Sequence, residues 1–598
     1  MTRLLTFATV SVTSLAATVF ASACPPRLVP VEIDGVQYNC KCSPADPCWP
    51  DKNAWDALNA TVNGALIAHI PPAAVCYNEF RGQLTFDAAA CADAKANWAS
   101  EDWQIGRPAA ALWTWGSNNT CELTDNRDAT CGMGNYPEFV IMAKTQAQVK
   151  AGVDFARNRN IRLVIRNTGH DFEARSVGAG SLAINTHGLQ DISFTDTYDG
   201  PGDYQGPAVT VGAGVQGFQL LDFAHALTPP QTVVTGECGT VGVAGGFIQG
   251  GGHGPLTSMY GFAADNALSF DVIDSSGNSI KANAESNSDL FWALKGGGPG
   301  NYAAVISVTM RTYPDDVPTA GIYLNVNATT GAQFPQVLRA THIINEQANS
   351  LVEKGLYAIY ELYPVPILGA LHVQPIMGFN MTASELDAAV KPLLEAFDAE
   401  GIPYDTGTLE FSDYYSIYRG FFEPEAAAQN GLTGGWTFTR GDLRAENQAA
   451  VAEVIEMSLS PRPDLLGIII SHLFDPGLTV SESRSSTHPR WKGATMRTMS
   501  ILIQGLNATW DQKLDLNDVM VNNITEKYKQ AAPNGLAYVN ENYAFMNDWQ
   551  SAFWGDNYPK LKDIKKQWDP AGVFYSPSTP GSEDWHIVDF AHRLCMKK

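Results

Sequence analysis

The sequence predicts an α+β fold made of more than one domain. Between residues 146 and 234, segments of strand character alternate with segments of helical periodicity, which is typical of connected β-α-β units. Between about 316 and 535, strand-like apolar runs are mixed with amphipathic helices, which predicts a sheet covered by helices. The chain of 598 residues is also too long for one hydrophobic core, so two or more domains are expected.

Residues 1–23 have the features of a cleaved secretory signal. Arg3 precedes the apolar run LLTFATVSVTSLAATVF, and residues 21–23 supply the small side chains of a cleavage site. The run is short and rich in Ser and Thr, which argues against a membrane anchor. Secretion agrees with Asn-x-Ser/Thr sequons at Asn59, Asn118, Asn327, Asn380, Asn507 and Asn523.

Residues 24–134 are expected to form a disulfide-rich region, with a helix-like patch over 51–68. In an oxidising compartment its clustered cysteines indicate disulfides, although their pairing is open. A zinc site in CKCSPADPC is the alternative, which the absence of a nearby histidine disfavours. Only Cys238 and Cys595 lie outside the cluster, which consists of Cys24, Cys40, Cys42, Cys48, Cys76, Cys91, Cys121 and Cys131.

Residues 135–315 are expected to form the first folded domain. TQAQVKAGVDFARNRN and GVQGFQLLDFAHAL have helical spacing, and IRLVI, SLAIN, AVTVG and TVV have strand character. Residues 212–217 also match the G-x-G-x-x-G fingerprint, with Glu237 about twenty residues later. A Rossmann dinucleotide-binding unit is therefore an alternative, but no long series of strand and helix units surrounds the motif, and NAD is scarce outside cells.

The stretch Thr235–Gly254, TGECGTVGVAGGFIQGGGHG, is the most distinctive part of the chain. Glycines at this density let a backbone approach a large ligand closely and leave N–H groups free to bind phosphate or carbonyl oxygens. A flexible linker is the alternative, but the interleaved Val241, Val243 and Ile248 favour burial. We therefore expect the stretch to lie along a large bound ligand, with Cys238 as a reactive thiol.

Residues 316–535 are expected to form a second domain. GLYAIYEL, LHVQPIMGF and LGIIISHL are typical of strands, and Ser384–Glu400, Arg444–Ser458 and Trp510–Lys529 have helical spacing. This part contains no metal-binding cluster and no nucleophile motif, and no metal site is predicted. The aromatic-rich residues 536–598 are expected to return to the first domain.

Four blocks follow one another in the order RNTGHDFEARSVGAGSLAINTHGL, TGECGTVGVAGGFIQGGGHG, YGFAADNALSFDVIDSSG and DLFWALKGGGPGNYAAVIS. With the tail WQSAFWGDNYPKLKDIKKQWDP, they resemble the secreted fungal berberine-bridge-enzyme-like flavoproteins, of the vanillyl-alcohol-oxidase type, over most of the chain from about residue 135 onward. The resemblance implies a PCMH-type FAD-binding domain of two α+β subdomains (135–315) and a substrate domain with an antiparallel sheet covered by helices (316–535). It also implies a C-terminal segment (536–598) that returns to the FAD domain.

The resemblance further implies a flavin held by two covalent bonds. The histidine of the R-x-x-G-H turn bonds the flavin 8α carbon and the cysteine of the G-x-C-x-x-V-G loop bonds C6; these positions are His170 and Cys238 here. Imidazole and thiolate groups are suitable nucleophiles for an electron-poor ring. Val241, three residues after the cysteine, looks like the form found in oxidases. The other expected FAD contacts are Asn167, Thr168, Gly169, Asp171, Thr235, Gly239, Gly242, Gly245, Gly246, Gly250, Gly252 and Val305.

The catalytic base stays open at this point. Many relatives carry a Y-x-N-Y motif near the C-terminus whose last tyrosine assists deprotonation, whereas this chain has YVNE over residues 538–541. On a strand, Tyr538 and Asn540 would share one face, and Glu541 and Tyr543 the other. Glu541, with a pKa raised by burial, is one candidate base. The other candidates are Tyr260, His253 and Tyr543.

We expect a secreted, monomeric oxidase that transfers hydride from an alcohol, sugar or secondary-metabolite C–H to N5 of a covalent FAD and reduces O2 to H2O2. The net charge of −23 argues against nucleic-acid and anionic-membrane partners. One alternative is a dehydrogenase or oxidative cyclase of the same fold with low oxygen reactivity. The other is a secreted flavin-binding glycoprotein without catalysis.

Overall fold

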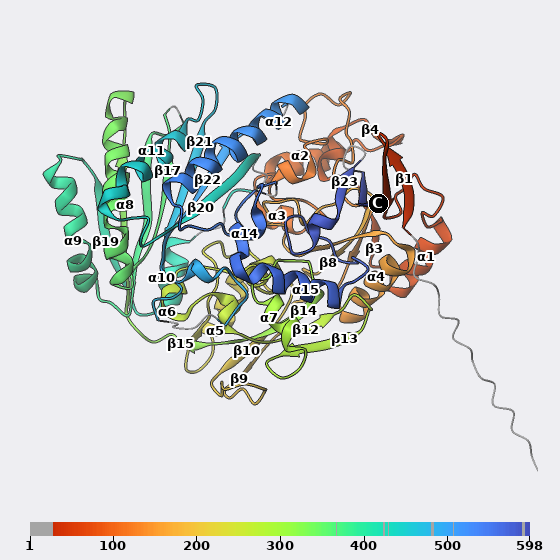
Figure 1. Cartoon of the computed structure of the whole chain (residues 1–598), viewed down its shortest axis with the longest axis horizontal. Helices are drawn as coiled ribbons and strands as arrows, with labels where there is room; N and C mark the ends of the chain where they lie inside the picture. Colours follow the sequence, from red (N-terminus) through yellow and green to blue (C-terminus); the bar gives the residue numbers. More distant parts are fainter. Residues whose placement is uncertain are drawn as a thin grey trace, which may run out of the picture.

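The computed structural model describes residues 28–365, 367–422, 425–427, 430–479, 484–505, 508–543, 545–588 and 592–598. The expected signal sequence, Cys24 and Asn507 lie outside these ranges. Figure 1 shows a large sheet with its helices on the left and several smaller sheets on the right. None of the helices in the described ranges combines the length and the apolarity that a membrane span needs.

One of the smaller sheets contains parallel strands joined by a helix, as the alternating pattern predicts. Its strands, in spatial order, are β3 (Leu66–Ala68), β6 (Phe139–Met142), β8 (Ser181–Asn185) and β7 (Arg162–Arg166). Both β6 and β7 run parallel to β8. Helix α4 (Gln146–Arg159) begins at a capping box formed by Thr145 and Gln148 and ends at Asn160, which has a φ of 53°.

The N-terminal region packs beside this sheet. The helix expected over 51–68 is wrong in its second half, because α1 (Lys52–Thr61) ends and Leu66–Ala68 pairs with β6 as strand β3. Gly64, with a φ of 81°, turns the chain between the two elements. Further elements here are β4 (Glu79–Phe80), β5 (Gln83–Leu84), α2 (Ala88–Asn97) and α3 (Glu101–Ile105).

A second small sheet is antiparallel and carries the glycine-rich stretch on its connections. Its order is β13 (Ser279–Asn283), β12 (Ala267–Ile273), β14 (Ala304–Arg311), β10 (Ala208–Gly212) and β9 (Ile192–Thr195). The G-x-G-x-x-G segment leads from β10 into α5 (Gly217–His225), but all the pairings of β10 are antiparallel. The Rossmann alternative is therefore wrong. Other elements are α6 (Thr257–Tyr260), α7 (Ser288–Leu294), β11 (Gln231–Thr232) and β15 (Tyr313–Pro314).

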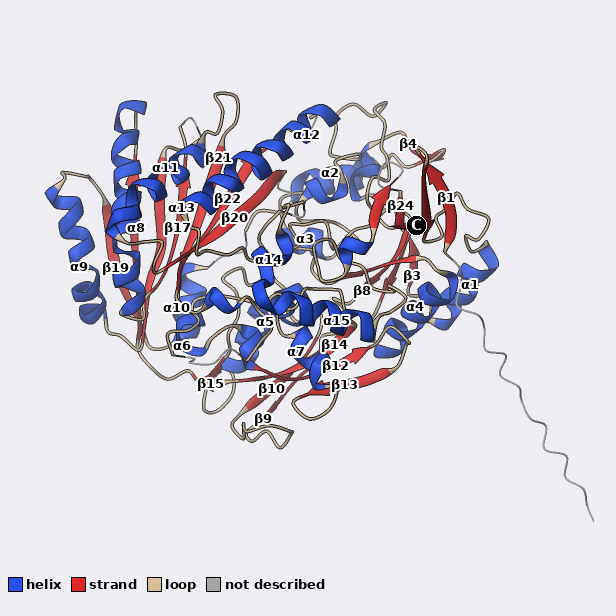
Figure 2. Cartoon of the chain, viewed as in Figure 1, coloured by secondary structure: helices blue, strands red, loops and turns tan. Residues whose placement is uncertain are grey.

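The large sheet has seven antiparallel strands with helices on one face (Figure 2). Its order is β19 (Asp405–Phe411), β16 (Thr319–Asn327), β18 (Ala370–Phe379), β17 (Tyr357–Tyr363), β21 (Gly467–Leu473), β22 (Ala494–Ile503) and β20 (Gly431–Thr439). The covering helices are α8 (Phe334–Glu353), α9 (Ala383–Ala399) and α11 (Gln448–Leu459). The helix predicted over 510–529 consists of α12 (Trp510–Asp518), a π-helical segment (Val519–Thr525) and α13 (Glu526–Ala531).

The last sixty or so residues contact the smaller sheets, and Leu536 at their start also forms an antiparallel bridge with Thr437 of the large sheet. Trp554 donates its indole N–H to the Gly296 carbonyl at 2.9 Å, and Phe574 forms a parallel bridge with Leu163 of β7. The C-terminal strand β24 (Arg593–Lys597) pairs with β2 near the N-terminus. The elements of this segment and their sheet partners are α14 (Trp549–Trp554), α15 (Tyr558–Trp568), β23 (His586–Val588), β1 (Val29–Ile33) and β2 (Val36–Cys40).

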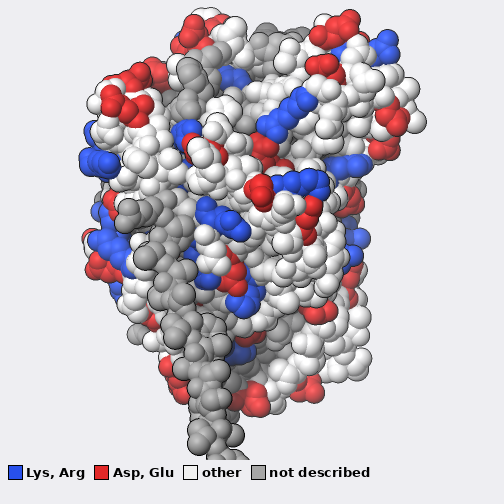
Figure 3. All heavy atoms as spheres, turned by 90° about the vertical axis from the view of Figure 1, so that its right-hand side faces the viewer, with Lys and Arg blue, Asp and Glu red and all other residues white. Residues whose placement is uncertain are grey.

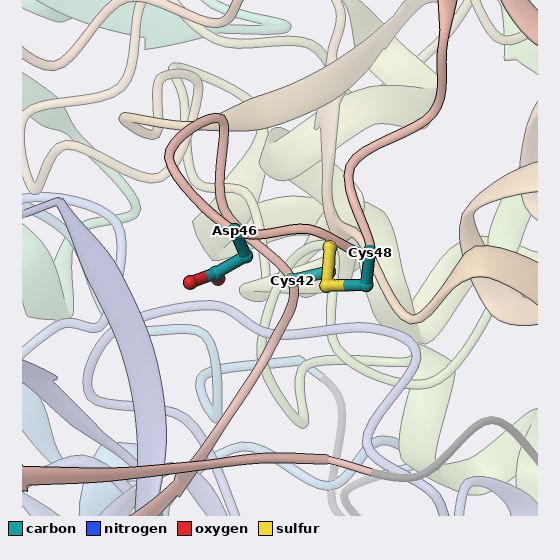
Figure 4. Close-up of side chains that lie close together, drawn as sticks. All are labelled: Cys42, Asp46 and Cys48. Atoms are coloured by element: carbon teal, nitrogen blue, oxygen red, sulfur yellow. A yellow bond between two sulfur atoms is a disulfide. The ribbon is translucent and has the colours of Figure 1, made fainter.

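The described cysteines form disulfides everywhere except at Cys238. Figure 4 shows the sulfurs of Cys42 and Cys48 bonded to each other, so the zinc alternative for CKCSPADPC is wrong. Asp46, between them in sequence, binds Arg593 at 2.7 Å. The pairs are Cys40–Cys595, Cys42–Cys48, Cys76–Cys91 and Cys121–Cys131.

Charged side chains of both signs are interspersed on the face of the molecule in Figure 3. Lys and Arg side chains on this face are separated by Asp, Glu and uncharged residues and do not merge into a continuous basic patch.

Removing the Cys40–Cys595 disulfide is expected to lower the free energy of unfolding by about 2–5 kcal/mol. The bond closes a loop of 555 residues, and a cross-link restricts the unfolded chain more when its loop is longer. Thermal unfolding of the Cys40→Ala/Cys595→Ala variant measures the loss. The Cys42→Ala/Cys48→Ala variant, whose bond spans 6 residues, is the control and should lose less; equal losses would contradict the prediction.

Candidate active site

A cavity lies where the turn after β7, the glycine-rich stretch and the C-terminal segment meet. Its walls come from residues 165–176, 241–249, 299–305, 538–541 and 575–576. It encloses about 1090 Å³ of space free of atoms, including open solvent at its mouth. Segments that lie far apart in the sequence, including the C-terminal residues, therefore form this cavity together.

The glycine-rich stretch forms a packed wall of this cavity, so the linker alternative is wrong. Val243 and Ile248 are buried, whereas Gly246 is exposed and lines the cavity. A Cβ placed on Gly242 would lie 2.4 Å from the Asn167 side chain, and one on Gly245 would lie 2.7 Å from it. Glycine at both positions therefore lets the stretch pack directly against the turn after β7.

Beside the cavity, His170 and Cys238 lie within reach of each other. The Thr240 hydroxyl is 2.8 Å from His170 Nε2 and 3.3 Å from Cys238 Sγ. The same hydroxyl donates to Glu101 Oε2 at 2.6 Å, and Cys238 Sγ lies 3.7 Å from Glu101 Oε1. Glu101 comes from α3 in the N-terminal region, and no sequence motif marks it.

Burial sets the protonation of this cluster. Burial, with a contribution from Arg166, lowers the pKa of His170 to about 3, so its imidazole is neutral. Burial also raises the pKa of the Cys238 thiol well above its usual range, and the nearby carboxyl groups of Glu425 and Glu101 act in the same direction. The pKa of Glu101 is itself raised by burial. The thiol therefore stays protonated until a base removes its proton.

The segment over residues 538–543 is a turn rather than the strand that the sequence suggested. The Glu541 N–H donates to the Tyr538 carbonyl at 3.2 Å. Asn540 Nδ2 donates to the Gly246 carbonyl at 3.0 Å, and the Gly252 N–H donates to the Tyr538 hydroxyl at 3.0 Å. These bonds to the glycine-rich stretch replace strand pairing, so the expected alternation of faces does not occur.

Glu541 lines the cavity, but its pKa moves opposite to the expected direction. His253 Nε2 is 2.9 Å from Glu541 Oε1, and an Arg497 nitrogen is 3.4 Å from Oε2. Although burial alone would raise the pKa of Glu541, these two neighbours lower it to about 2. The carboxylate is therefore ionised at all ordinary pH values.

A second carboxylate–imidazole pair lies next to the first. His472 Nε2 is 2.6 Å from Glu237 Oε1, and the Tyr357 hydroxyl donates to Glu237 Oε2 at 2.7 Å. The rings of His253 and His472 have centroids 4.9 Å apart. His472 and Tyr357 come from strands of the large sheet, so the second domain supplies this side of the site. Sequence reasoning missed both residues because neither belongs to a recognisable motif.

Two candidate bases lie away from the cavity wall. The Tyr543 hydroxyl binds Asn517 on α12. The Tyr260 ring stacks on Tyr313 with centroids 3.6 Å apart, and burial raises the pKa of Tyr260 to about 12. Neither contributes to the lining of the cavity. Among the described candidates, Glu541 alone lines it, with His253 directly behind.

The expected FAD contacts divide into two groups. Those that do not line the cavity are Thr235, Cys238, Gly239, Gly250 and Gly252. Asp171 lines it, but its carboxylate accepts bonds from the N–H groups of its own turn, at residues 173, 175 and 176. The other expected contacts that line the cavity are Asn167, Thr168, Gly169, His170, Val241, Gly242, Gly245, Gly246 and Val305.

Comparisons with known proteins agree with this architecture. The family model "FAD binding domain" matches residues 137–283, and "Berberine and berberine like" matches residues 537–578. The chain is 32% identical to the FAD-linked oxidoreductase ZEB1 of Gibberella zeae, over 93% of this chain and 95% of that protein. It is 31% identical to the VAO-type flavoprotein oxidase VAO615 of Thermothelomyces thermophilus, over 93% of this chain and 95% of that protein.

Comparison with a solved structure agrees with these sequence comparisons. The structure of the VAO-type flavoprotein MtVAO615 from Myceliophthora thermophila C1 superposes with a TM-score of 0.84 at 30% identity, covering 93% of this chain and 100% of that chain. The predicted α+β fold with a PCMH-type FAD-binding part and an antiparallel sheet is thereby confirmed. The chain belongs to the berberine-bridge-enzyme-like, VAO-type flavoproteins and is an FAD-linked oxidoreductase.

Proposed function

We propose that this protein is an oxidase that holds FAD through covalent bonds to His170 and Cys238 and uses O2 to oxidise an alcohol, a sugar or a secondary metabolite. The observation that carries the proposal is the cluster beside the cavity. A ring nitrogen of His170, Cys238 Sγ and a Glu101 oxygen all lie within 4.8 Å of one another. A neutral imidazole and a thiol that can be ionised are the two nucleophiles that such attachment requires.

The residues around the cavity fit FAD. Asn167 Oδ1 is buried without a hydrogen-bond partner in the described part of the chain. Gly246 and Gly300 line the wall, and the Cβ position of Gly300 meets no atom within 4 Å, so backbone groups can approach a flat ligand. When bound, FAD would supply the electron acceptor for a hydride, which is two electrons and one proton, from the substrate, and O2 would then take the two electrons with two protons to give H2O2.

We assign the catalytic base to Glu541. Glu541 and Asp171 are the carboxylates of the described cavity lining, and the Asp171 oxygens are occupied by backbone N–H groups. Glu541 Oε2 has no hydrogen-bond partner among the described residues, although Arg497 is nearby. His253 and Arg497 are positioning residues that hold Glu541 in its ionised form, which is the form that can accept a proton.

An extracellular monomer is part of the proposal. Four disulfides support folding in an oxidising compartment, and the signal-like residues 1–23 support export. A dehydrogenase or cyclase with low oxygen reactivity stays the alternative, which the oxidase form of Val241 disfavours. Peroxide release during turnover separates the two.

Acid precipitation of the purified protein tests the proposed attachment. Yellow colour in the pellet, with flavin mass on the peptides that contain His170 and Cys238, is the expected result. His170→Ala and Cys238→Ala should each retain one bond and lose the other. A colourless pellet with FAD in the supernatant would overturn covalent attachment. A screen of alcohols and sugars by peroxide release then addresses the substrate class.

A further inference from the structure

The N-terminal region contributes a buried carboxylate to the site of flavin attachment. Glu101 is 4% exposed and follows Ser100, the N-cap residue of α3. Its two oxygens face the side chains of His170, Thr240 and Cys238. Oε1 is 3.9 Å from His170 Nδ1, and Oε2 is 2.6 Å from the Thr240 hydroxyl. Both oxygens lie within 3.8 Å of Cys238 Sγ. A buried carboxylate is costly unless it is paired or has a function.

We propose that Glu101 is the base that activates Cys238 for its bond to the flavin and that, through Thr240, it sets the tautomer of His170. This inference rests on the proposed covalent attachment. It assigns to the disulfide-rich region a chemical role in maturation of the enzyme.

The sulfur needs such a base. Its thiol is buried and protonated, and only a thiolate is an effective nucleophile. The oxygens of Glu101 lie 3.7 and 3.8 Å from Sγ, within hydrogen-bonding range for sulfur. The Thr240 hydroxyl, 3.3 Å from Sγ, is too weak a base to serve and already donates its hydrogen to Glu101.

The same hydrogen bond orients the histidine. Because the Thr240 hydrogen goes to Glu101 Oε2 at 2.6 Å, the Thr240 oxygen accepts a hydrogen from His170 Nε2 at 2.8 Å. His170 Nδ1 then carries the lone pair and is the nucleophilic nitrogen. Loss of Glu101 would free the Thr240 hydrogen and let the ring adopt the other tautomer.

The step at Cys238 balances as follows. Glu101 takes the thiol proton, the sulfur forms a bond to flavin C6, and the C6–H proton leaves to solvent. The two electrons of the broken C–H bond remain on the flavin ring, and O2 removes them as H2O2. No other oxidant is required.

Glu101→Gln in the full-length secreted protein tests the inference. The readout is the rate and extent of covalent flavin on the Cys238 peptide, by mass spectrometry, after the purified protein is incubated with FAD and O2. We expect attachment at Cys238 to be at least about tenfold slower, and attachment to rise when the incubation pH is raised, because bulk base then ionises the thiol. A defect in packing alone would not be restored by higher pH.

Control variants separate a failure of this inference from a failure of the proposed function. Glu122→Gln changes another carboxyl of the N-terminal region, a half-buried one that accepts a hydrogen bond from Asn119, and should attach flavin like the wild type. Normal attachment in Glu101→Gln would overturn the inference alone, whereas absence of covalent flavin in the wild type would overturn the proposed function. If Glu101→Gln does not fold, Thr240→Val is measured: slower attachment at His170 supports the relay, and unchanged attachment contradicts it.

Discussion

Glu541→Gln is expected to lower the rate of substrate oxidation by about 10²–10⁴-fold. The substitution keeps the size of the side chain and replaces the carboxylate in the cavity wall by a neutral amide that cannot accept the proton. Covalent attachment of FAD should be unchanged, because Glu541 is separate from the cluster around Cys238. Anaerobic stopped-flow measurement of flavin reduction, with a substrate found by peroxide release, gives the rate directly. A rate within threefold or so of the wild type would show that another group takes the proton.

His253→Gln is the companion variant, and the dependence of its oxidation rate on pH tests the role of His253. In the wild type, His253 and Arg497 lower the pKa of Glu541 to about 2, so ionisation of this base is not lost as the pH falls from 7 to 4. Without His253, burial acts against a weaker opposing charge and the pKa of Glu541 rises. As the pH is lowered, the oxidation rate of the variant should therefore begin to fall at a higher pH than the rate of the wild type. An unchanged acid limb would contradict the role of His253.

Arg166→Met is expected to destabilise the protein by about 3–5 kcal/mol, because several buried carbonyl oxygens would lose their donor. The fully buried Arg166 side chain donates hydrogen bonds of 3.1 to 3.4 Å to carbonyl groups. Burial lowers its pKa to about 10, so it is charged at neutral pH. The acceptors are the carbonyls of Gln104, Ile105, Ala110, Asn167 and Thr168.

The same bonds join α3 to the turn that carries His170. Loss of Arg166 should therefore slow flavin attachment as well as lower stability, and urea unfolding of the flavin-free protein separates the two effects. Arg162→Met is the matched control on the same strand. Arg162 is also buried, but its guanidinium faces the Tyr575 ring at 5.7 Å and its Nε has no partner among the described residues. Equal destabilisation by both substitutions would contradict the role assigned to Arg166.

Local patterns in the sequence determined much of the fold and one half of the site. The helical spacing of α4 and α9 and the apolar runs of β7, β17 and β21 predicted those elements because each depends on neighbours a few residues away. The glycine-rich stretch and the R-x-x-G-H turn identified Cys238 and His170 for the same reason. The structure brings these two residues together, and their bonds to FAD stay a prediction.

The other residues of the site depend on tertiary contacts that the sequence does not reveal. Glu101 meets Thr240 across 139 residues of sequence, and Glu541 meets His253 across 288, so no local pattern could reveal either pair. The pKa of Glu541 was expected to rise because of burial, whereas the neighbours that lower it, His253, Arg497 and His472, come from distant elements. The strand expected at 538–543 became a turn because its side chains bind the glycine-rich stretch. Spacing along the chain predicts many of the local elements, but the charge and partners of a buried group depend on what other elements bring next to it.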